Sequence, residues 1–224
     1  MLFRSLSGVQ SGPQVRLVGK PDYWDDACAQ LMKRDRILRK LIPQHGDYWL
    51  QHQAPAFTTL VRSIVGQQLA SRTADQLWRK LLDGCGQALS PELILELGYE
   101  ALHGLGLPKR KAEYIVDLAT HFDARKIDPQ AWQSLSDEAV IADLCAIRGV
   151  GRWTADMFLI FNLHRPDVLP LDDAGLLKAI SQHYFSGEPV SRFEAREVAQ
   201  AWAPWCTVAT WHLWRSLNTV AVRY

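Results

Sequence analysis

The stretch that decides the fold is residues 144–154, LCAIRGVGRWT. A helical apolar pattern leads into Gly149, Val150 and Gly151, and a second helical pattern begins at once with Arg152. Two glycines one residue apart allow backbone angles that are closed to other residues, so the chain can turn tightly between two helices. Such a turn exposes backbone N–H groups at a helix N-terminus, where they can bind a phosphate oxygen. We therefore predict a hairpin of two helices at residues 144–155.

Outside the hairpin, the pattern is typical of an all-α protein. Apolar residues recur at helical spacing through almost the whole chain, and strand signals are scarce. Hydroxyl residues that can cap a helix precede three helical segments, at Ser90, Ser136 and Ser191, and glycines stand where helices would stop, at Gly84, Gly98, Gly106 and Gly187. We predict roughly ten short helices, with residues 21–224 forming a helical domain in two lobes and residues 1–20 an N-terminal arm.

Composition narrows the class of protein without identifying it. The 224 residues carry a net charge of +1, so the total charge gives no argument for a nucleic-acid partner. The basic runs at residues 33–40 and 109–111 are interpreted as solvated helix faces. No segment approaches the roughly 20 apolar residues that span a membrane, and the N-terminus lacks a secretory signal, so we expect a cytoplasmic protein. The four cysteines are about sixty residues apart, and we expect reduced, mostly buried thiols.

Three further motifs accompany the hairpin in order along the chain. They are IVGQQLAS at residues 64–71, GLPKRKA at 106–112 and DVLPLDDAG at 167–175. With the hairpin, they resemble the helix-hairpin-helix superfamily of DNA glycosylases over about residues 50–220. The nearest group is that of 3-methyladenine DNA glycosylase II, on the basis of GRWTA at 151–155 and of PW and WHLW between 204 and 214. Larger members of that group carry an N-terminal β domain, and this sequence resembles a compact, all-helical version.

The resemblance implies a fold and a partner. The fold would be two helical lobes around a DNA-binding cleft, and the protein a monomer that binds damaged double-stranded DNA in the cytoplasm, at the bacterial nucleoid. In that setting the hairpin residues Gly149, Gly151 and Thr154 would contact DNA phosphate. Phosphate contacts fix register without reading sequence, which suits an enzyme that must scan all DNA.

The reaction that the resemblance implies builds positive charge on a sugar as an N-glycosidic bond breaks. A nearby carboxylate stabilises such a cation, and Asp173 matches the catalytic position of the superfamily. It could also orient or deprotonate the attacking water. Asp172 and Asp173 both stand at the start of a helical segment, where either could act as a helix cap. We assign catalysis to Asp173 and the cap to Asp172.

Trp153 separates two branches of the superfamily. Bifunctional members carry a lysine at this position, directly after the hairpin, and use its amine to form a Schiff base and cut the strand. Tryptophan has no nucleophile, so we predict a monofunctional glycosylase that excises alkylated bases such as 3-methyladenine and 7-methylguanine. The sequence also lacks the four clustered cysteines that hold an iron–sulfur cluster in other branches, and we expect no required cofactor.

Aromatic rings can favour an alkylated, cationic base by cation–π attraction. Trp153 and Trp214 match the pocket aromatics of the group, although Trp214 also belongs to a run of tryptophans at near-helical spacing that is typical of a core. Met157 stands where enterobacterial-type relatives have an aromatic residue, and it is the third predicted contact to the base.

Two further roles come from the resemblance. Gln68 falls where the superfamily inserts a side chain into the gap left by a flipped base, and Gln67 and Gln68 could instead bridge neighbouring helices. Family members bind a sodium or potassium ion through hairpin carbonyls, here those of Cys145, Ile147 and Val150. The alternatives to the predicted function are a bifunctional glycosylase with lyase activity, a module that recognises DNA structure without catalysis, and an unrelated helical scaffold.

Overall fold

The computed structural model describes residues 19–50, 55–69, 71–86, 88–124 and 127–217, and all secondary structure in these ranges is helical. The prediction of an all-α protein is therefore confirmed, and the predicted arm at 1–20 lies almost wholly outside the described residues. The α-helices are α1 (Trp24–Arg34), α2 (Leu38–Leu41), α3 (Ala56–Gly66), α4 (Ser71–Gly84), α5 (Pro91–Gly104), α6 (Lys109–Asp123), α7 (Asp137–Cys145), α8 (Arg152–Phe161), α9 (Ala174–Tyr184), α10 (Arg192–Ala199) and α11 (Cys206–Leu217), and two 3-10 helices are η1 (Ile42–His45) and η2 (Ala131–Gln133).

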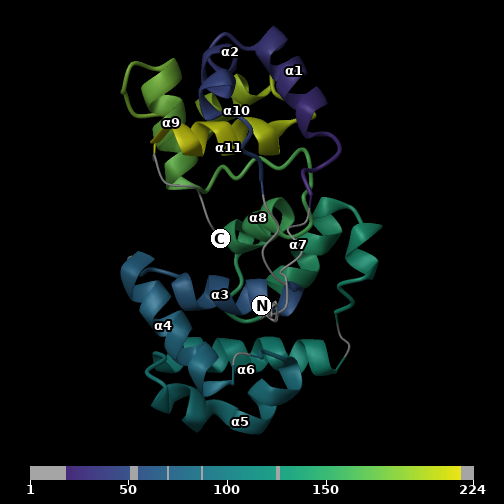
Figure 1. Cartoon of the computed structure of the whole chain (residues 1–224), viewed down its shortest axis with the longest axis vertical. Helices are drawn as coiled ribbons and strands as arrows, with labels where there is room; N and C mark the ends of the chain where they lie inside the picture. The colour runs from purple at the N-terminus through teal and green to yellow at the C-terminus, as the bar shows by residue number, and fades with distance from the viewer. Residues whose placement is uncertain (1–18, 51–54, 70, 87, 125–126, 218–224) are drawn as a thin grey trace, which may run out of the picture.

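The helices fall into two groups (Figure 1). In one, α11 packs against α1, α2 and α9, and α10 packs against α9. In the other, α6 packs against α3 and α5, and α3 also contacts α4 and α8. The pair α7 and α8 packs together and lies between the two groups in Figure 1. The hairpin joins this pair, and its residues Gly151 and Arg152 are exposed.

Helix ends follow the capping rules on which the sequence predictions were based. The hydroxyls of Ser90, Ser136 and Ser191 each accept a hydrogen bond from the N–H three residues later, and Glu194 completes a capping box with Ser191. These side chains satisfy N–H groups that have no partner inside the helix. Gly98, predicted as a stop, has φ +70° and interrupts α5 rather than ending it.

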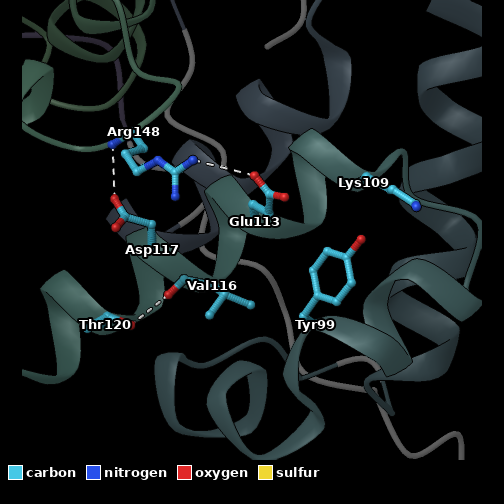
Figure 2. Close-up of a pocket in the computed structure, with 7 residues that line it drawn as sticks. All are labelled: Tyr99, Lys109, Glu113, Val116, Asp117, Thr120 and Arg148. Atoms are coloured by element: carbon cyan, nitrogen blue, oxygen red, sulfur yellow. Dashed lines mark hydrogen bonds and ion pairs between the residues drawn. The ribbon is translucent and has the colours of Figure 1, made fainter.

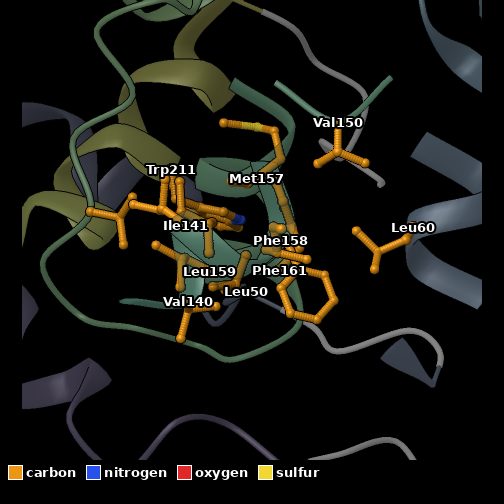
Figure 3. Packing of buried hydrophobic residues seen from close by; sticks show 14 of the residues in the cluster. Leu50, Leu60, Val140, Ile141, Val150, Met157, Phe158, Leu159, Phe161 and Trp211 are labelled. Atoms are coloured by element: carbon orange, nitrogen blue, oxygen red, sulfur yellow. The ribbon is translucent and has the colours of Figure 1, made fainter. Parts of the chain in front are cut away.

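The core is apolar and rich in tryptophan. Figure 3 shows residues of α7, α8 and α11 packed together, among them Phe158 and Trp211. Trp202, Trp211 and Trp214 are buried, as their near-helical spacing predicts, and Trp205 is half-buried. All four cysteines are free thiols, but only Cys85 and Cys206 are buried. The expectation of mostly buried thiols is wrong for Cys145, which is exposed because it ends α7 at the molecular surface. In the described residues, no helix is both long and apolar enough to cross a membrane.

Buried His212 and half-buried His45 stack on each other in the group formed around α11. The His212 ring is 1% exposed and stacks on that of His45, with the two Nδ1 atoms 2.9 Å apart, and its Nε2 lies 3.5 Å from Cys28 Sγ. Burial lowers the pKa of His212 to about 3, and His45 and the Arg215 guanidinium contribute in the same direction. Burial also lowers the pKa of His45. Both rings are therefore neutral in the folded protein at neutral pH.

This pair predicts a loss of stability in mild acid. Unfolded histidine takes up a proton near pH 6.5, and folded His212 does so only near pH 3, so the free energy of unfolding falls as pH drops between these values. From pH 6.5 to pH 5, the contribution of His212 falls by about 1.5 kcal/mol. Urea unfolding at both pH values should show a smaller loss in His212→Gln than in the wild type. Equal losses would exclude the pair as the source.

Candidate active site

Asp173 is the N-cap residue of α9. Its Oδ1 accepts a hydrogen bond from the Leu176 N–H at 2.6 Å. The prediction that Asp172 is the cap is wrong, because Asp172 is exposed and forms an ion pair with Arg192 at 2.8 Å. The cap position requires the extended backbone that Asp173 adopts directly before Ala174, the first residue of the helix. The predicted catalytic residue and the helix cap are thus one side chain.

Two tryptophans hold the Asp173 carboxylate from other helices. Trp153 Nε1 of α8 donates to Oδ2 at 2.9 Å, and Trp214 Nε1 of α11 donates to Oδ1 at 2.8 Å. With the Leu176 N–H, three donors fix the orientation of the carboxylate. Three segments far apart in the sequence therefore converge on one negative charge, and they include two of the three residues predicted to contact the base.

The second tryptophan is both a core residue and a site residue. Trp214 is 6% exposed, and one face of its ring stacks on Phe161 with centroids 5.8 Å apart and planes inclined by 10°. Trp153 is half-buried. Met157, one turn after Trp153 on α8, is 2% exposed and packs in the core, as Figure 3 shows. Of the three predicted base contacts, Trp153 is thus the most accessible.

Gly175 is required by the close packing around Asp173. A Cβ atom at Gly175 would lie 3.0 Å from Asp173 Oδ1 and 3.4 Å from Trp214 Cδ1. Both atoms belong to groups held by hydrogen bonds, so a larger residue would displace the carboxylate or the indole. The glycine in the motif LPLDDAG is explained by this contact.

The hairpin brings an uncapped helix N-terminus to the surface. Gly149 has φ +84°, which favours glycine, and Gly151 is the N-cap residue of α8 and has no side chain to cap it. The first N–H groups of α8, including that of Thr154, have no partner within the helix. Thr154 itself is 4% exposed, so its side chain is largely shielded from solvent. Of the predicted cation ligands, Ile147 accepts the Val150 N–H through its carbonyl at 3.1 Å, and Cys145 is exposed.

A buried carboxylate that is absent from the predicted site residues lies on α8, one turn after Arg152. Asp156 is 3% exposed and pairs with Arg152 at 3.0 Å, and Arg152 also binds Glu138 of α7 at 3.0 Å. Burial raises the pKa of Asp156 to about 6, with Arg152 opposing the shift. The spacing of four residues between Arg152 and Asp156 on one helix could have indicated this pair. Through Arg152, the ion pairs link the first turn of α8 to Glu138 of α7.

The predicted wedge residue lies in the loop between α3 and α4. We call residues 67–69 the wedge loop; within it, Gln68 is exposed and has φ +56°. The Gln67 side chain contacts the hairpin, where its Nε2 donates to the Gly149 carbonyl at 2.8 Å. The two glutamines therefore have different roles: Gln67 bridges to the hairpin, and Gln68 projects outward.

A groove of about 610 Å³ lies elsewhere, along α6. Figure 2 shows its lining, which includes Tyr99, Glu113, Asp117 and Arg148 and contains neither Asp173 nor the tryptophans that bind it. The cluster around Asp173 has the fixed charge and aromatic surroundings that chemistry on a base requires, so the groove is not the candidate active site.

Comparisons with known proteins agree with this geometry. Residues 61–204 match the family model of the HhH-GPD superfamily base excision DNA repair protein. The structure of a DNA-3-methyladenine glycosidase from Bacillus halodurans is similar, with a TM-score of 0.79 and 34% identity over 86% of this chain and 89% of that one. The Schizosaccharomyces pombe 3-methyladenine DNA glycosylase, in complex with abasic DNA, has a TM-score of 0.78 and 26% identity over 89% and 99% of the two chains.

A curated Bacillus subtilis relative has a matching description. It is a putative DNA-3-methyladenine glycosylase that is 28% identical over 81% of this chain and 66% of its own length. The family match covers more than half of the chain, including both the hairpin and Asp173. This chain therefore belongs to the HhH-GPD superfamily of base excision DNA repair proteins.

Proposed function

We propose that this chain is a monofunctional DNA glycosylase that flips an alkylated base, such as 3-methyladenine or 7-methylguanine, out of duplex DNA and hydrolyses its N-glycosidic bond in base excision repair. The observation that carries the proposal is the Asp173 carboxylate, which receives hydrogen bonds from Trp153, Trp214 and the Leu176 N–H. The similar proteins are named as glycosylases or a glycosidase of 3-methyladenine, and this supports alkylated bases as the class of substrate.

The arrangement suits a reaction in which charge develops on the sugar. As the bond to the base stretches, the sugar becomes a cation, and a fixed carboxylate stabilises it without having to reorganise. The same carboxylate can orient water for attack on the sugar. An alkylated base carries a positive charge and leaves as a neutral molecule, so the site can act without a general acid.

The residue at position 153 favours hydrolysis over strand cleavage. Lyase chemistry needs an amine at this place, and Trp153 supplies an indole whose N–H is directed at Asp173. Its half-buried ring can stack on a flipped base. The alternative of a binding module without catalysis does not account for a carboxylate held by two indoles.

The hairpin is the proposed DNA anchor of a monomer. A phosphate oxygen would take the place of a cap at the α8 N-terminus, next to Gly149 and Gly151. Backbone oxygens suit a sodium or potassium ion, and the Ile147 carbonyl keeps one lone pair free after it accepts the Val150 N–H. With the carbonyls of Cys145 and Val150, it would hold an ion that adds positive charge beside the phosphate.

The experiment for this proposal uses a duplex with one 7-methylguanine. Incubation with the purified protein should leave an abasic site, so the strand should break only after hot alkali. Breakage without alkali would indicate the bifunctional alternative. Because hot alkali also attacks unexcised 7-methylguanine, the control is the same duplex without protein, and breakage no greater than in this control would contradict glycosylase activity.

Gln68→Ala should slow excision from a paired duplex by about tenfold and leave stability nearly unchanged. The exposed side chain would fill the gap left by the flipped base, and an exposed side chain contributes within about 0.5 kcal/mol to folding. Single-turnover rates and thermal melting measure the two effects. A wild-type rate with a much lower melting temperature would make Gln68 a structural residue.

A further inference from the structure

We propose that Lys111 and Gln67 are positioning residues that join the wedge loop to the hairpin through one face of α6, so that a phosphate held at the hairpin fixes where Gln68 enters the duplex. This inference rests on the proposed function. It extends that function by identifying what keeps the two DNA-contacting elements in register, although they are about eighty residues apart in the sequence.

Lys111 anchors the wedge loop from α6. Its Nζ donates to the carbonyl of Val65 at 2.6 Å and to that of Gln67 at 2.8 Å. These carbonyls lie at the C-terminal end of α3, where the helix carries a partial negative charge that favours a cation. Lys111 is half-buried, and burial lowers its pKa. The contact therefore takes a lysine partly out of solvent to hold the backbone on the N-terminal side of Gln68.

The hydrogen bonds of Lys111 hold the backbone next to Gln68, the predicted wedge residue. Its φ of +56° is uncommon for a residue other than glycine and has to be maintained by the surroundings. The carbonyl of the peptide that enters Gln68 is the Gln67 oxygen that Lys111 binds. Removing the ammonium group frees this peptide to rotate, and the exposed Gln68 side chain then loses its fixed direction.

The same face of α6 also anchors the hairpin. Tyr114 lies one turn after Lys111, and its ring packs so closely on Gly149 that a Cβ there would come within 2.1 Å of it. Asp117, one turn further, accepts the Arg148 N–H at 2.9 Å, as Figure 2 shows. Lys111, Tyr114 and Asp117 recur every three residues, so they form one stripe of α6, which we call the bracing face.

Gln67 connects the wedge loop directly to the hairpin. Its side-chain amide donates to the Gly149 carbonyl at 2.8 Å, and its own backbone carbonyl is bound by Lys111. The wedge loop thus contacts the hairpin itself as well as the helix that holds the hairpin. A shift of either element would break hydrogen bonds to the other.

The test separates the effect of Lys111 on extrusion of the base from its effect on binding of DNA. Lys111→Met keeps the length of the side chain and removes the donors, and Lys109→Met removes the same charge from an exposed position on the same helix. The substrates are two duplexes in which 7-methylguanine lies opposite cytosine or opposite an abasic-site analogue. The second duplex has no pair to break, so extrusion costs less there and depends less on the wedge.

We expect Lys111→Met to lower the single-turnover rate by about tenfold with the paired duplex and by less than about threefold with the unpaired one, because two hydrogen bonds that orient the wedge are lost. Lys111→Arg should restore part of the rate, and Lys109→Met should keep the wild-type ratio of the two rates. The dissociation constant of Lys111→Met for an abasic duplex should match that of Lys109→Met.

Equal losses on both duplexes, or a wild-type ratio in Lys111→Met, would overturn the positioning role. If Lys111→Met does not fold, Gln67→Leu removes the bond to Gly149 and must show the same selective loss on the paired duplex. A wild-type protein that excises from neither duplex would overturn the proposed function together with this inference, whereas normal wild-type excision with an unselective Lys111→Met overturns the inference alone.

Discussion

Replacing Asp173 with asparagine should lower the single-turnover excision rate by about a hundredfold to a thousandfold, while binding to a duplex with an abasic site survives. The substitution keeps the shape of the side chain and removes the charge that faces the developing cation. Hypoxanthine, a neutral base, should suffer a larger loss than 7-methylguanine, because a cationic base departs more readily unaided. The measurement is the rate with each substrate under enzyme excess.

The hydrogen bonds of Asp173 set the control for this prediction. An amide has one oxygen, so asparagine cannot accept from both Trp153 and Trp214, and the unpaired indole should cost about 1–3 kcal/mol of stability. Thermal melting must therefore show that the variant is folded at the assay temperature. Asp172→Asn breaks only an exposed ion pair with Arg192 and should keep the wild-type rate. A folded Asp173→Asn protein with a near-wild-type rate would contradict the assignment.

Gly151→Asp should weaken binding to every DNA sequence by about tenfold to a hundredfold without unfolding the protein. Gly151 is exposed, its φ is −101°, and a Cβ there meets no atom within 4 Å. Aspartate is a favoured N-cap residue and glycine is only slightly worse, so the stability of α8 should stay the same or rise by a few tenths of a kcal/mol. The added carboxylate would occupy the N–H groups proposed to bind phosphate and would repel the phosphate itself.

Gly151→Asn is the matched control, since asparagine caps the helix equally well and adds no charge. The ratio of the two dissociation constants, measured with an abasic duplex at fixed salt, gives the electrostatic part of the effect. Wild-type affinity in a folded Gly151→Asp protein would exclude the hairpin as the DNA anchor. Gly149 is a poorer position for this test, because any side chain there would collide with Tyr114.

Local signals in the sequence predicted much of the fold. The capping serines Ser90, Ser136 and Ser191 begin helices as expected, because an N-cap depends on the few residues around it. The two hairpin glycines likewise mark a tight turn between two helices, but only Gly149, with φ +84°, needs the freedom of glycine. The prediction is wrong for Gly151, whose φ of −101° other residues adopt as well. Gly98 was less predictable, since a glycine that kinks a helix and one that ends it have the same local pattern.

Contacts between residues far apart in the chain could not be predicted from the sequence. The local pattern of LPLDDAG lets either Asp172 or Asp173 cap the helix, and the resemblance alone predicts Asp173 as the catalytic residue. That Asp173 is also the cap, and that Trp153 and Trp214 on two other helices hold its carboxylate, is visible only in the structure. The prediction that residues 109–111 form a solvated basic run is wrong for Lys111, whose ammonium group donates to the Val65 carbonyl of α3. A lysine one turn before buried Ile115 of α6 has the same local sequence pattern whether its side chain is solvated or contacts another helix. Tertiary packing decides such cases.

The measurement that tests the central claim most directly is chromatography of the free bases that the wild-type protein releases from methylated duplex DNA. The proposed function predicts release of 3-methyladenine and 7-methylguanine, from DNA whose strands stay intact until they are treated with alkali, and a large loss of this release in Asp173→Asn. Methylated DNA that is bound by the folded protein but yields no free base would contradict the account and would leave a DNA-binding module in its place.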